Sequence, residues 1–141
     1  MKLAYLLDTS VVSIPISKRP SPRVLDRLTE SSGRCAICSH VWHELVFGAR
    51  RLPRGKRRDA LDTYLAEVVR TSFPILPYDE AAAAWHGEER ARQQKAGRPA
   101  PFVDGEIAAV AHTNGLTLAT LNPRHFKLFQ RLEVEDWSTA R

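Results

Sequence analysis

The stretch Leu3-Ala4-Tyr5-Leu6-Leu7-Asp8-Thr9-Ser10 decides how this chain folds. Residues 3–7 form an unbroken apolar run, which is typical of a strand buried on both faces in a parallel sheet covered by helices. An acid and two hydroxyl residues follow the run directly. Because ligands gather outside the carboxyl ends of parallel strands, Asp8 lies where a functional site is expected.

Short apolar segments alternate with helical segments along the rest of the chain. Further strands are predicted at residues 34–38, 73–76, 116–120 and 132–134. Helices are predicted at residues 24–29, 40–51 with Ser39 as a cap, 57–69, 80–96 with Asp79 as a cap, and 102–114. This alternation predicts the α/β class, as a three-layer α/β/α domain with a mainly parallel central sheet.

Length and composition describe an ordinary globular chain. The 141 residues fit a single domain spanning 1–141, with 43% hydrophobic and 26% charged residues. The net charge of +5 is compatible with a polyanionic partner. The apolar run at the start is too short to span a membrane and lacks a signal-peptide cleavage region. We therefore expect a cytoplasmic protein without a membrane partner.

Three acids lie in stretches that hold almost no other acid: Asp8 among residues 1–25, Glu44 among 31–58, and Asp104, with its neighbour Glu106, among 90–132. Glu44 is on a largely apolar helix where little wet surface is expected, and Asp104 opens a helix that continues with apolar residues 107–111. A strand-end turn would explain Asp8 alone, and helix N-capping would explain Asp104 alone.

The three acids together favour a shared cation, since buried carboxylates need a positive charge or several donors. Ligands that are all oxygen suit Mg²⁺ or Mn²⁺. The chemistry that uses such a cluster is phosphoryl transfer to water.

Four segments, in this order, resemble the motifs of a known family. They are Leu6-Leu7-Asp8-Thr9-Ser10, then Trp42-His43-Glu44-Leu45 with Gly48, then Gly97-Arg98-Pro99 leading to Asp104 and Ile107-Ala108-Ala109, and finally Leu118-Ala119-Thr120-Leu121-Asn122 with His125-Phe126. The family is that of the PIN domains, and the length is typical of VapC-type toxins.

The resemblance implies an endoribonuclease that depends on Mg²⁺. It implies a catalytic site of Asp8, Glu44, Asp104 and Asn122, in which the first three bind the metal. It further implies an RNA substrate, a homodimer, and a hetero-oligomer with a VapB-type antitoxin. Many PIN domains have Asp where this chain has Asn122, which puts a second metal in doubt. A PIN-fold module that binds RNA or protein without cutting is the alternative.

Cys35, Cys38, His40 and His43 form a C-x-x-C-x-H-x-x-H cluster that invites a zinc interpretation. Structural zinc sites normally draw their ligand pairs from two separate segments. Here all four residues fall within nine positions that span a strand, a turn and a helix start. We therefore predict a buried thiol pair and two histidines on a helix surface.

Six basic residues gather within residues 50–58, at a predicted corner between two helices. They are open to three interpretations: a solvated loop, a patch for RNA phosphates, or a contact for an acidic stretch of the antitoxin. For a contact with either RNA or antitoxin, the candidate residues are Arg54, Arg57 and Arg58.

Overall fold

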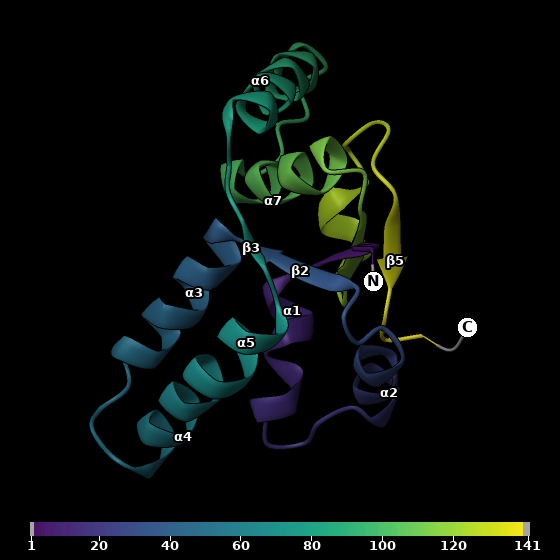
Figure 1. Ribbon diagram of the computed structural model, residues 1–141. Coiled ribbons are helices and arrows are strands. Elements are labelled where there is room, and N and C mark those ends of the chain that lie inside the picture. The colour runs from purple at the N-terminus through teal and green to yellow at the C-terminus, as the bar shows by residue number, and fades with distance from the viewer. Residues whose placement is uncertain (1, 140–141) are drawn as a thin grey trace.

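The computed structural model describes residues 2–139. A five-stranded sheet in the order β3-β2-β1-β4-β5 forms its centre, and each neighbouring pair of strands is parallel. The strands are β1 (Tyr5–Leu7), β2 (Cys35–Cys38), β3 (Ile75–Leu76), β4 (Thr117–Thr120) and β5 (Val134–Asp136). Figure 1 shows α6 and α7 on one side of the sheet and α1, α2, α4 and α5 on the other. The predicted α/β/α architecture is confirmed.

The connections between the strands are mostly helical. They are α1 (Thr9–Val12), α2 (Pro22–Glu30), α3 (Ser39–Arg50), α4 (Lys56–Tyr64), α5 (Arg70–Ser72), α6 (Glu80–Lys95) and α7 (Phe102–Thr113), with 3-10 turns η1 (Ile14–Ile16) and η3 (Pro123–Phe126) and a π-helical segment η2 (Leu65–Val69). Among residues 2–139, none of these helices is both long and apolar enough to cross a membrane.

The sheet is buried as the apolar run at the N-terminus predicts. β1 lies between β2 and β4, with Tyr5 opposite both Cys35 and Thr117. Leu6 and Leu7 are fully buried, and so is the stretch of α7 from residue 107 to 111. The carboxyl ends of β1, β2 and β4 therefore meet at one edge, where the chain turns into α1, α3 and η3.

Several local predictions differ from the structure. Ser39 is the first residue of α3 rather than its cap, and its hydroxyl donates to the carbonyl of Leu76 at 3.3 Å. The helix predicted at 57–69 is divided, because α4 passes into a π-helical segment at Leu65. The last strand lies at 134–136 instead of 132–134. Asp79 caps α6 as predicted, accepting from the amide of Ala82 at 3.0 Å.

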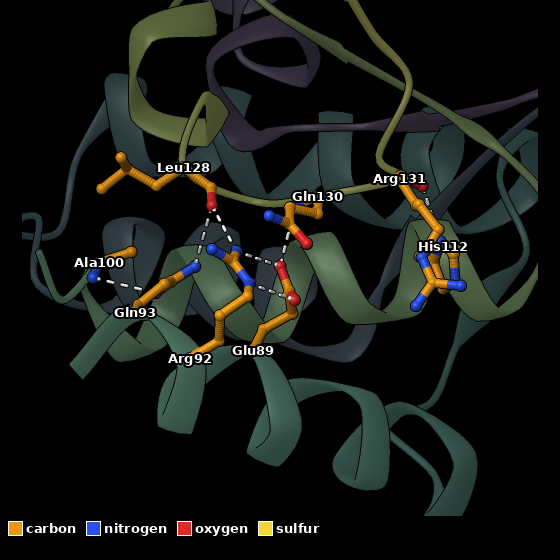
Figure 2. A network of polar contacts seen from close by, with 8 residues as sticks. All are labelled: Glu89, Arg92, Gln93, Ala100, His112, Leu128, Gln130 and Arg131. Atoms are coloured by element: carbon orange, nitrogen blue, oxygen red, sulfur yellow. Dashed lines mark hydrogen bonds and ion pairs between the residues drawn. The ribbon is translucent and has the colours of Figure 1, made fainter. Parts of the chain in front are cut away.

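A polar network fastens α6 to the loop that follows η3 (Figure 2). The buried Glu89 carboxylate accepts from Arg92 and from the amide of Gln130, each at 2.8 Å. Arg92 also donates to the carbonyl of Leu128 at 2.7 Å. Burial alone would raise the pKa of Glu89, but these hydrogen bonds and the charges of Arg92 and Arg131 lower it. Because α7 packs on α6, the network also steadies the helix that carries Asp104.

Candidate metal centre and active site

Asp8 is held in place by donors from two strand ends. It caps α1, and its Oδ1 accepts from the amide of Thr9 at 2.8 Å. Its Oδ2 accepts from the hydroxyl of Ser10 at 3.1 Å and from that of Thr120 at 2.8 Å. These contacts fix the plane of the carboxylate at the carboxyl end of β1.

The two hydroxyls at Oδ2 also tie down the end of β4. Thr120 is fully buried, and its Oγ1 accepts from the amide of Asn122 at 3.0 Å. The Oγ of Ser10 accepts from the amide of Leu121 at 3.1 Å. Thr9 and Thr120 were not predicted as site residues, although they stand inside the first and fourth motifs.

Glu44 lies at the same edge but is more exposed than its apolar neighbours predict. Its side chain is 42% exposed, and the following Phe47 is 58% exposed. The prediction that this helix leaves little wet surface is therefore wrong, because only one side of α3 is covered. The Oε1 of Glu44 accepts from the Thr9 hydroxyl at 2.7 Å and lies 3.6 Å from Nε2 of His40.

Asp104 lies in the first turn of α7, two residues after the helix begins. Burial raises the pKa of its carboxyl group above the ordinary value. Among the nearby charges, that of His125 lowers this pKa, those of Asp8 and Glu44 raise it, and that of His40 lowers it. The three predicted acids thus share one electrostatic environment, although they come from distant parts of the chain.

Asn122 follows β4 at this edge, with an exposed side chain that does not cap η3. The 3-10 turn η3 brings in His125, whose charge acts on Asp104. His40, His125 and Glu106 were not predicted as site residues. The signals for them were the place of His125 in the fourth motif and that of Glu106 close to Asp104, while His40 drew attention only as part of the cysteine–histidine cluster.

The donor set suits a hard cation. Asp8, Glu44 and Asp104 offer only carboxylate oxygens, and Asp104 is desolvated next to two other acids. A divalent cation would offset this repulsion. Within residues 2–139, however, no three His, Cys, Asp or Glu side chains are close enough together to hold a metal ion in the present arrangement. Asp8 and Glu44 are nevertheless close enough to Asp104 for their charges to raise its pKa.

Zinc is not favoured at the cysteine–histidine cluster. Cys35 and Cys38 are buried in β2, and burial raises the pKa of each thiol to about 11. Both thiols are therefore protonated near neutral pH, whereas the thiolate is the form that binds metal. His43 is exposed on α3 as predicted, while His40 is mostly enclosed.

The basic residues form the corner between α3 and α4, away from the sheet (Figure 1). Arg50 pairs with Asp62, and Arg58 donates to the carbonyl of Leu52 at 3.4 Å. Arg54 and Arg57 are exposed, and Arg57 lines a cavity of about 310 Å³. Of the three predicted contact residues, Arg58 is thus partly committed to the corner itself.

Known proteins match this chain and its fold over nearly the whole length. Residues 5–132 match the model of the PIN domain. The chain is 33% identical over 136 residues to the tRNA(fMet)-specific endonuclease VapC of Shigella flexneri, which covers 96% of this chain and 99% of that protein.

Solved structures agree with these matches. The crystal structure of FitAcB from Neisseria gonorrhoeae superposes with a TM-score of 0.85 at 30% identity, covering 96% of this chain and 99% of the other. The crystal structure of DNA-bound VapBC from Salmonella typhimurium gives a TM-score of 0.84 at 27% identity, covering 96% and 98%. The chain therefore belongs to the PIN-domain family and, within it, to the VapC-type branch.

Proposed function

We propose that this protein is the toxin of a VapBC-type pair and that it cleaves RNA as a Mg²⁺-dependent endoribonuclease. The observation that carries the proposal is the convergence of Asp8, Glu44 and Asp104 at one edge of the sheet, where the charges of Asp8 and Glu44 both raise the pKa of Asp104. The names of similar proteins support it, since they include ribonucleases and toxins.

Asp8, Glu44 and Asp104 would hold the cation, with Mn²⁺ as a possible replacement for Mg²⁺. When bound, the metal would neutralise charge on the phosphodiester and lower the pKa of a water molecule. Asp8 is oriented for this role by Thr9, Ser10 and Thr120. Asn122 contributes a neutral side chain at the same edge, so it would orient a water or the RNA rather than attract the metal by charge.

The partners of the proposed toxin are an RNA substrate and a small VapB-type antitoxin. Similar solved structures are named as complexes of VapBC and FitAB, which supports a partner of the antitoxin kind. We further propose a homodimer within a toxin–antitoxin hetero-oligomer. Arg54 and Arg57 are the candidate contacts to RNA phosphates or to an acidic antitoxin segment.

Cleavage of structured RNA with Mg²⁺, with and without a chelator, tests the proposed activity. Asp8→Asn and Asp104→Asn should each reduce the rate by more than roughly 100-fold, because even outer partners of metal ligands contribute 10-fold to 100-fold. Asp26→Asn, which changes an exposed residue of α2, is the control and should cleave RNA like the wild type. RNA retention without cleavage would instead favour a non-catalytic binding module. Full activity in both site variants would show that the site has been misplaced.

A further inference from the structure

One histidine lies between acids of two different helices at the rim of the site. His40 is the second residue of α3, one turn before Glu44. Its Nε2 is 3.6 Å from Oε1 of Glu44, and its Nδ1 is 3.8 Å from Oε1 of Glu106 on α7. The His40 side chain is only 17% exposed, and its ring also lies 5.6 Å from the ring of His43.

Glu44 has more need of such a neighbour than Asp8 does. Its side chain is 42% exposed, whereas Asp8 is shorter and accepts from three donors. A glutamate loses rotamer freedom when it is ordered, and this loss opposes cation binding. Thr9 holds Oε1 of Glu44 from one side at 2.7 Å. His40 faces the same oxygen from α3 itself, which leaves the other oxygen for a cation.

The geometry gives His40 a role other than ligation. Both of its ring nitrogens already face carboxylate oxygens, those of Glu44 and Glu106. Its charge also acts on Asp104. Groups that contact metal ligands in this way orient them and are worth roughly 10-fold to 100-fold in metal affinity.

We propose that His40 is a positioning residue: it ties Glu44 of α3 to Glu106 of α7 and so holds Glu44 ready beside Asp8 and Asp104. This role rests on the proposed metal site. Glu106 anchors the far side of the imidazole and does not bind the metal itself.

Calorimetric titration of the whole chain with Mg²⁺ and with Mn²⁺ tests the proposal without relying on cleavage. His40→Ala should weaken metal binding by roughly 10-fold or more. His40→Gln should recover part of this loss, because its amide can still donate to one carboxylate. His43→Ala is the matched control, since it removes the exposed histidine whose ring lies 5.6 Å from that of His40 and leaves the contacts of His40 with the two acids in place. It should bind metal within about twofold of the wild type.

A double variant separates anchoring from ligation by Glu106. Glu106→Gln alone should weaken binding, while adding it to His40→Ala should cause little further loss, because the two residues act as one unit. If the double variant loses metal affinity by the product of the two single losses, Glu106 is an independent ligand and its role as an anchor is overturned. Thermal unfolding shows, before the titrations, whether each variant is folded. If His40→Ala does not fold, the metal affinities of His40→Gln and Glu106→Gln test the positioning role.

The outcomes for the two proposals are distinct. A wild-type chain that binds neither cation contradicts the metal site, and the role of His40 falls with it. A wild-type chain that binds metal, with unchanged affinity in His40→Ala, leaves the proposed function standing and overturns the positioning role alone.

Discussion

Asp8 and Glu44 carry the same charge but are held by neighbours of different origin. Asp8 receives two of its donors from the residues next to it in sequence and a third from Thr120. Glu44 is held by Thr9 and faces His40, so its orientation depends on how α3 sits against the end of β1. At the scale of single residues, Thr9 is the link, because its amide serves Asp8 and its hydroxyl serves Glu44.

Asn122 tests whether the fourth motif faces the metal. Asn122→Asp should bind Mg²⁺ more tightly than the wild type, since it adds a negative charge beside the proposed cation. Asn122→Ala should reduce cleavage less than Glu44→Gln, which removes a charge that the cation needs. Calorimetric metal titration alongside cleavage assays measures both effects. Unchanged affinity in Asn122→Asp would mean that residue 122 points away from the metal.

At the scale of elements, α6 and α7 approach closely because of one glycine. Gly105 directly follows Asp104 on α7, and a Cβ placed on it would stand 2.1 Å from Nε2 of His86 on α6. His86 is 1% exposed, and its Nδ1 lies 2.8 Å from the hydroxyl of Tyr78. Burial, aided by the charge of Arg90, lowers the pKa of His86 and keeps its ring neutral. The helix carrying Asp104 is therefore positioned by a side chain that fills the space over Gly105.

Gly105→Ala should destabilise the fold by about 1–3 kcal/mol, because His86 must move or the two helices must separate. Gly87→Ala, on α6, is the control, since nothing lies within 4 Å of its added Cβ. That control should be neutral or stabilising by up to about 1 kcal/mol, as alanine favours a helix interior over glycine. Denaturant unfolding measures both changes. If the destabilisation persists when His86 is also changed to Ala, contact with this ring is not its cause.

At the scale of the whole molecule, some of the basic side chains are paired with acids, so only part of the positive charge can attract a polyanion. The chain carries a net charge of +5, yet Arg50 pairs with Asp62 and Arg92 pairs with Glu89. Arg54 and Arg57 remain exposed at the α3–α4 corner. Because α3 runs from the site edge to this corner, a polyanion bound at both would lie along that helix.

The double variant Arg54→Ala and Arg57→Ala should weaken RNA binding and reduce its salt dependence. Each lost phosphate contact lowers the log–log slope by up to about one unit, because fewer counterions are released. Binding isotherms at several salt concentrations give the slope. Lys2→Ala with Arg34→Ala is the matched control, as both exposed residues lie at the opposite edge of the sheet. An unchanged slope together with weaker antitoxin binding would assign the corner to the protein partner.

The class of fold, and the edge of the sheet at which the acids meet, follow from the order of residues along the chain. An unbroken apolar run ending in Asp8 implies a buried parallel strand, and the carboxyl ends of such strands lie together whatever the details of packing. The capping of α6 by Asp79 was equally predictable, since a cap depends on residues three apart. The helix cap depends on neighbouring residues, and the meeting of the strand ends follows from the topology of a parallel sheet.

The side chains that surround the acids, and the exposure of each acid, depend instead on how distant elements pack together. The bond from Thr120 to Asp8 joins residues 112 positions apart, and Glu106 meets His40 only because α7 packs on α3. Likewise, Glu44 is exposed although its neighbours are apolar, because other helices cover only one side of α3. Such features depend on the packing of distant elements and on side-chain rotamers, neither of which a local pattern of residues encodes.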